Sequence, residues 1–180
     1  MLRASVPTVP PVDQTPQAIQ VSLLQRAADP GDTALERVDR DRQLLDPGST
    51  RLAYQDQDHR YGVATAADGT HICLVRGLAA QPIGSIDCTA WDRFQREGIL
   101  TQVFADPDDD ATSGPLLAIV APDGYTQLHV DGQTHDLNDN LTVLRAPASD
   151  TTARLHGPAG TRVVQLPAGS SDSPRSPRPP

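Results

Sequence analysis

The residues best placed for chemistry are His71, Cys73 and Cys88. His71 and Cys73 are two positions apart, so their side chains would project to the same face of an extended strand. Imidazole and thiolate are both zinc ligands, but zinc fingers and ribbons bring their ligands in close pairs, and the sequence offers no fourth ligand at such a spacing. We therefore expect no metal at these residues.

A structural role for the two cysteines is favoured instead. They are the only cysteines in the chain and do not form a CxxC pair, which is typical of either one disulfide or two buried thiols. A bridge that closes a loop of about 15 residues would raise the free energy of unfolding by roughly 3 kcal/mol. We favour the disulfide between Cys73 and Cys88, with two buried free thiols as the alternative.

Two further histidines, His129 and His135, flank a turn signal at residues 131–132. A two-residue hairpin would place the two imidazoles on opposite faces, which argues against a metal clamp. His129 would share a face with the diagonal Asp136, whose carboxylate could orient a general base. A nucleophile motif is lacking. We expect no catalytic residues, and a hydrolase that uses His129 and Asp136 is the alternative.

Two acidic runs could offer carboxylate oxygens to a hard cation. The first has Ala111 where a calcium-binding EF-hand loop needs glycine and Leu117 where it needs a bidentate glutamate, and the second has Leu141 at the glycine position. We expect solvated loops, no metal and no cofactor, with a metal-assisted enzyme at the first run as an alternative. The runs comprise Asp106, Asp108, Asp109 and Asp110, and Asp136, Asn138, Asp139 and Asn140.

Composition excludes two classes of partner. The 180 residues include 23 acidic and 15 basic side chains, for a net charge of -8, so nucleic acid is not an expected partner. The sequence has no apolar run of about 18 residues, so a membrane span is not expected. Residues 1–11 lack the apolar core of a signal peptide, which predicts either a cytosolic protein or a natural start upstream of Met1.

The ends of the chain differ from its middle. Residues 1–12 and 167–180 are proline-rich and predict disordered tails. Residues 13–48 predict two short helices, one capped by Thr15 and one opened by a capping box of Thr33 and Glu36. Their apolar stripes would be Ile19, Leu23 and Ala27 in the first helix, and Leu35, Val38 and Leu45 in the second.

Residues 49–166 predict a mainly β domain, because apolar residues alternate with polar ones between turn signals. One short helix interrupts this pattern at residues 89–97, with Gly98 as its stop. The predicted fold is an antiparallel β-sandwich or a partly open barrel. Its strands lie near residues 52–54, 61–63, 70–76, 99–105, 115–121, 125–130, 133–137, 141–145, 151–156 and 161–166.

Four features between about residue 49 and residue 166 carry a resemblance to known proteins. They are the strand at residues 71–75 (HICLV), Cys88, the segment at residues 117–124 (LAIVAPDG) and the segment at residues 140–145 (NLTVLR). This region resembles a group of uncharacterised actinobacterial proteins that have an extracytoplasmic, β-rich C-terminal domain. In that group the region usually follows a hydrophobic anchor and its cysteines look paired. The resemblance implies no activity.

These observations lead to a functional expectation. We expect a non-catalytic, extracytoplasmic or cell-envelope interaction module, whose partner is a protein or a glycan. Tyr54, Tyr61 and Trp91 are the expected contact surface if they gather in one exposed patch, and core residues otherwise. A cytosolic accessory protein that docks through its N-terminal helices is the alternative.

Overall fold

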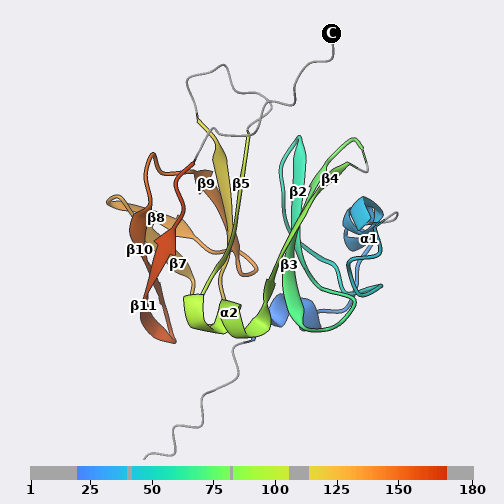
Figure 1. The fold of residues 1–180 in the computed structure, drawn as a ribbon, viewed down its shortest axis with the longest axis horizontal. Helices are drawn as coiled ribbons and strands as arrows, with labels where there is room; N and C mark the ends of the chain where they lie inside the picture. The colour runs from blue at the N-terminus through green and yellow to red at the C-terminus, as the bar shows by residue number, and fades with distance from the viewer. Residues whose placement is uncertain (1–19, 40–41, 82, 106–113, 170–180) are drawn as a thin grey trace, which may run out of the picture.

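The computed structural model describes residues 20–39, 42–81, 83–105 and 114–169 (Figure 1). Its described part contains eleven strands in three antiparallel sheets. The first sheet has the order β1 (Arg51–Gln55), β2 (His59–Thr65), β3 (His71–Leu78) and β4 (Gly84–Ala90). The central sheet has the order β5 (Leu100–Phe104), β6 (Leu116–Val120) and β9 (Leu141–Arg145). The third has the order β11 (Gly160–Leu166), β10 (Thr151–Gly157), β7 (Gln127–Val130) and β8 (Gln133–Asp136).

The central sheet lies between the two four-stranded sheets and is covered on both faces (Figure 1). Strand β6 shows this directly. Ala118 and Val120 belong to the apolar cluster shared with the first sheet, whereas Leu117 and Ile119 belong to the cluster shared with the third sheet. A strand buried on both faces needs a continuous apolar run instead of an alternating one, and β6 has the sequence LLAIV.

The N-terminal segment reaches both faces of the first sheet, because Leu23 joins the apolar cluster shared with the central sheet and the residues from Leu35 onward cover the outer face. It contains η1 (Ser22–Gln25), α1 (Asp32–Glu36) and η2 (Arg37–Asp39). Leu35 and Val38 from this segment join a cluster that includes Cys73. Gly62 of β2 makes the close approach possible, because a Cβ atom there would lie 2.6 Å from Cδ1 of Leu35.

The mainly β, antiparallel character of the chain is confirmed, but the N-terminal prediction needs correction. Two helices were expected, and the described residues hold a 3-10 turn, a five-residue α-helix and a second 3-10 turn. Gly31 occupies the N-cap position and Thr33 lies inside α1, so the capping box does not form. Ala27 is exposed, whereas the other predicted stripe residues within the described part are buried, namely Leu23, Leu35, Val38 and Leu45. Thr15 and Ile19 lie outside the described residues.

The inserted helix α2 (Trp91–Glu97) ends as predicted but begins later. Gly98 follows it in the left-handed conformation, with φ of 81°, where a glycine has no steric penalty. Thr89 and Ala90 belong instead to β4, a strand that the sequence did not reveal. The reason is its exposure, because Asp87 and Cys88 are both exposed and leave no alternating pattern.

A buried carboxylate joins the N-terminal segment to the first sheet. Asp32 is 2% exposed, and its oxygens accept hydrogen bonds from the backbone N–H of Asp29 (2.8 Å) and of Leu52 in β1 (2.7 Å). The guanidinium of Arg26 donates to the same side chain at 2.8 Å. Because Asp32 uses its carboxylate in this way, the chain around α1 is held by tertiary hydrogen bonds and needs no capping box.

We expect Asp32→Asn to lower the free energy of unfolding by about 2 kcal/mol, because the amide loses the ion pair with Arg26 and one of its two acceptor oxygens. Urea denaturation followed by circular dichroism would measure the loss. Asp92→Asn is the matched control, since Asp92 pairs with Arg96 on the exposed face of α2, and its unfolding midpoint should not move. Equal midpoints for the two variants would contradict the anchoring role of Asp32.

Candidate functional site

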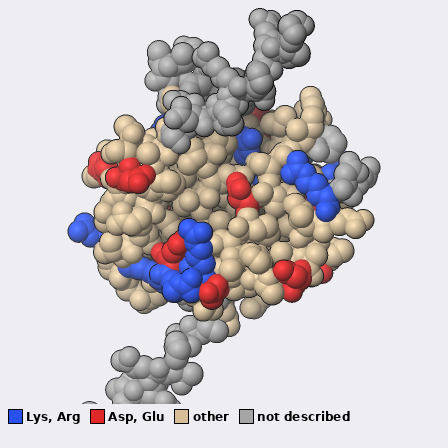
Figure 2. Space-filling model, in the orientation of Figure 1, with Lys and Arg blue, Asp and Glu red and all other residues tan. Residues whose placement is uncertain are grey.

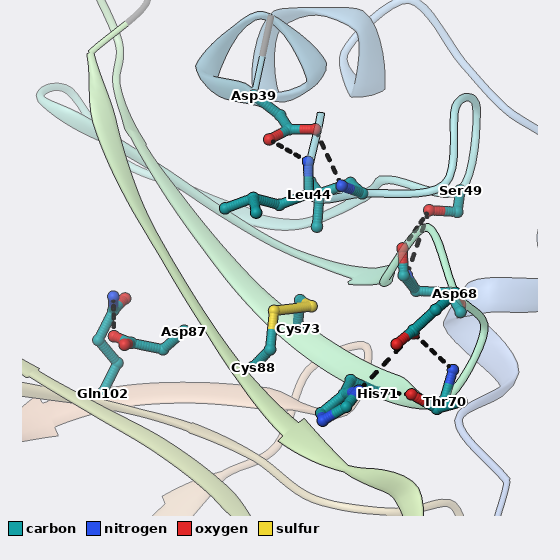
Figure 3. The surroundings of a disulfide bond; sticks show 12 residues. Asp39, Leu44, Ser49, Asp68, Thr70, His71, Cys73, Asp87, Cys88 and Gln102 are labelled. Carbon is teal, nitrogen blue, oxygen red and sulfur yellow. Dashed lines mark hydrogen bonds and ion pairs between the residues drawn. A yellow bond between two sulfur atoms is a disulfide. The ribbon is translucent and has the colours of Figure 1, made fainter. Parts of the chain in front are cut away.

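Cys73 and Cys88 lie directly opposite one another on β3 and β4, and the structure joins them in a disulfide (Figure 3). Their Cα atoms are 4.0 Å apart. Cys73 is buried against the N-terminal segment, whereas Cys88 is exposed on the edge strand. Bonded sulfurs are not thiolates, so they cannot serve as zinc ligands here. His71 instead lies 2.6 Å from the hydroxyl of Thr70 (Nδ1 to Oγ1).

The hairpin of β7 and β8 has the predicted register. His129 lies opposite Thr134 and His135 lies opposite Leu128, so the two imidazoles are on opposite faces. His129 is exposed on the outer face of the third sheet, where its ring lies at a tilt against the ring of His156, with 4.4 Å between centroids. Asp136 accepts a hydrogen bond from Gln127 at 3.4 Å. The alternative enzyme would need His129 and Asp136 to line a cleft, and both instead lie on this outward face.

The acidic runs do not build a cation site within the described chain. Asp106, Asp108, Asp109 and Asp110 lie outside the described residues. In the second run, Asp139 and Asn140 adopt positive φ, and the side-chain amide of Asn140 donates to Asp123 at 2.9 Å. Among the described residues, no group of three His, Cys, Asp or Glu side chains is arranged to hold a metal ion.

The three aromatic residues do not form the expected exposed patch. Tyr61 is fully buried, because β2 is an inner strand whose inward face packs on Phe104, with 5.7 Å between ring centroids. Tyr54 is 40% exposed, and Trp91 is partly buried against Phe94. Assigning Tyr61 to a contact surface is therefore wrong, and it belongs to the core.

A groove of about 840 Å³ runs along three described edge strands, one from each sheet. These strands are β4, β5 and β11, and Figure 1 shows β5 in the sheet between those of β4 and β11. Because α2 connects β4 to β5, it brings the edge of the first sheet next to the edge of the central sheet. We call this concavity the edge groove. Its lining includes Asp87, Ile99, Thr101, Gln102, Val103, Gln165 and Leu166.

The floor of the edge groove is the backbone of β5. Just beyond the two ends of β6, Ala121 donates its N–H to the carbonyl of Asn140 (2.8 Å), and the carbonyl of Pro115 accepts from Ala146 (2.8 Å). The odd-numbered residues of β6 therefore pair with β9. The even-numbered residues therefore pair with β5, because backbone groups alternate in direction along a strand. Leu100, Gln102 and Phe104 lie opposite these even-numbered residues.

The intervening residues of β5, Thr101 and Val103, must direct their peptide N–H and C=O groups away from β6. Among the described strands, β5 pairs only with β6. These four backbone groups therefore point from the free edge of the strand into the edge groove. Such an edge can pair with a further strand.

The wall formed by β4 is polar. Gln102 is 5% exposed, and its Nε2 donates to Ser85 Oγ at 2.9 Å and to the Asp87 carboxylate (Figure 3). Its Oε1 is buried and accepts no hydrogen bond from the described residues. A buried acceptor without a donor is costly, so the position of Gln102 depends on the two hydrogen bonds that its Nε2 donates.

The opposite wall is mixed. Ile99 and Val103 belong to, or pack against, the apolar cluster that includes Val164 and Leu166 of β11, and the exposed side chain of Val163 also lines this side. Asp150 and Gln165 lie on the same side. Both sides of the edge groove therefore carry a carboxylate and an amide, and the β11 side adds branched aliphatic groups.

The α2 end of the edge groove holds arginines that already have partners. Figure 2 shows basic and acidic side chains intermingled over this part of the surface. Arg93 pairs with Glu97 and Arg96 pairs with Asp92, each at 2.7 Å, and the hydrogen bond from Arg96 lowers the pKa of Asp92. Arg162 donates to the last carbonyls of α2. These pairings give no free cationic cluster for an anionic ligand.

Sequence reasoning missed the edge groove because it missed β4. One signal was present, since Gln102 lies between Leu100 and Phe104, which are apolar residues on the same face of the strand.

Comparisons with protein-family models, curated proteins and solved structures found no match to the chain. In the described part, no helix has the length and apolar character needed to cross a membrane.

We expect the double variant Cys73→Ala, Cys88→Ala to unfold with a free energy about 3 kcal/mol below that of the native chain, because the denatured chain gains the freedom of a loop of about 15 residues. Guanidinium denaturation would measure the difference. The native chain with its disulfide chemically reduced is the control and should lose a similar amount. A reduced chain, verified by mass, that unfolds at the unchanged midpoint would contradict this role.

Proposed function

We propose that this chain is a non-catalytic interaction module that binds a protein partner in the edge groove. The observation that carries the proposal is the free edge of β5, where Thr101 and Val103 direct backbone groups into a groove between two other sheets. Exposed backbone N–H and C=O groups can form hydrogen bonds with a further chain. Their position in a concave surface limits those partners to a segment that fits the groove.

The proposed place of action is outside the cytoplasm or at the cell envelope. A structural disulfide is stable in an oxidising compartment and is rare where thiols are kept reduced. The Cys73–Cys88 bond supports this location, as does the resemblance of residues 49–166 to extracytoplasmic domains. The net charge of -8 favours a partner other than nucleic acid.

A protein partner is favoured over a glycan by the lining of the edge groove. The groove is lined by aliphatic, polar and charged side chains, with no aromatic ring among them. At binding sites that offer no free strand edge, aromatic rings supply much of the area that contacts the ligand or partner. Here the backbone edge itself offers the recognition groups, and it matches another polypeptide.

The test is selection of a phage-displayed library of random dodecapeptides on the native protein. Thr101→Arg fills the edge groove, because Thr101 lines it, and should reduce the capture of selected clones at least about tenfold. Thr134→Arg is the matched control, since Thr134 is exposed on β8 outside the groove. Its capture should equal that of the native protein.

Two results would overturn the proposal. The first is a selection that enriches no clone on the native protein. The second is a set of clones that bind the Thr101→Arg and Thr134→Arg variants equally well, because binding would then occur away from the edge groove. Circular dichroism of both variants would establish that they are folded.

A further inference from the structure

We infer that the partner segment binds as an extended strand and becomes the fourth strand of the central sheet. This inference rests on the proposed function and specifies its binding mode. Among the described residues, the outer sheets each have four strands, whereas the central sheet has three. The position beside β5, where a fourth central strand would lie, is the edge groove.

The backbone of β5 has the pattern that strand addition requires. Thr101 and Val103 are two residues apart, which is the repeat at which a strand presents hydrogen-bonding groups to one neighbour. Strand β5 has five residues, so at about 3.3 Å per residue it offers an edge of roughly 17 Å. A bound segment of about five residues would match this edge.

The two walls determine which side chains the segment should carry. Successive side chains of a strand point to opposite faces, so alternate residues of the segment would face β4 and β11. Those that face β11 would meet the side chains of Val103 and the exposed Val163, which favours aliphatic residues. Those that face β4 would meet the exposed carboxylate of Asp87, which favours basic or hydroxyl-bearing residues.

Two edges of the described chain are poor occupants of the edge groove in a second copy. Strand β8 has the sequence QTHD and carries no aliphatic residue, and strand β1 is held by the N-terminal segment through the hydrogen bond from Leu52 to Asp32. Strand β9 (LTVLR) is also an edge and carries aliphatic residues, so a second copy is an outcome of the test below. The lining of the edge groove favours as occupant a partner segment in which aliphatic residues alternate with basic or hydroxyl-bearing ones.

The probe is the synthetic peptide acetyl-Lys-Val-Thr-Val-Thr-Val-Lys-amide, with binding measured by isothermal titration calorimetry. Its first control has the same composition without alternation, acetyl-Val-Val-Val-Lys-Thr-Thr-Lys-amide. Its second control carries N-methyl groups on the three valines, which removes donors from one edge. We expect each control peptide to bind at least about tenfold more weakly than the probe.

Variants of Val103 test the hydrogen-bond donor that the protein contributes to the same strand pairing. Val103→Pro removes the N–H that points into the edge groove, and proline is compatible with an edge strand. This variant should bind the probe peptide at least about tenfold more weakly than the native protein does. Val103→Ala keeps that N–H and should retain affinity within about threefold. If Val103→Pro does not fold, the N-methylated peptide decides the question on the native protein.

The outcomes separate this inference from the proposed function. Probe binding that is lost in Thr101→Arg but unaffected by N-methylation and by Val103→Pro would overturn strand addition and leave the edge groove as a binding site. If the probe does not bind, while the selected phage clones still lose binding to Thr101→Arg, only the proposed side-chain pattern of the segment would be overturned. A native dimer that Val103→Pro dissociates, measured by sedimentation velocity, would replace the partner segment by a second copy.

Discussion

The burial of β6 on both faces is the constraint on which the architecture depends. Leu117 and Ile119 need one apolar layer, and Ala118 and Val120 need another on the opposite side. A two-layered sandwich would expose one of these sets to water, at a cost of about 25 cal/mol per Å² of apolar surface. Two further sheets remove that cost, and the central sheet becomes the shared floor of both apolar clusters.

Stacking three sheets brings their edges together, and the edge groove follows from this. Protein edges that could pair with other chains are commonly protected by charge, bulges or covering segments. The edge of β5 is protected by its recessed position between β4 and β11. The same recess is the surface at which we propose that a partner segment binds.

The strongest links outside the apolar clusters hold the first sheet, which supplies one wall of the edge groove. The disulfide ties the exposed edge strand β4 to the buried strand β3. Gln102 ties β4 to β5 through Ser85 and Asp87. On the far side, Asp32 holds the N-terminal segment against β1. These links keep β4 in place although few of its side chains are buried.

Local signals in the sequence determined much of the chain. The turn at residues 131–132 set the register that places His129 opposite Thr134, and Gly98 set the end of α2. Only the tertiary structure decided the short N-terminal elements, the burial of Tyr61 and the meeting of Gln102 with Asp87. The physical reason is that alternation shows which residues share a face of a strand, but not which sheet covers that face or which edge stays free.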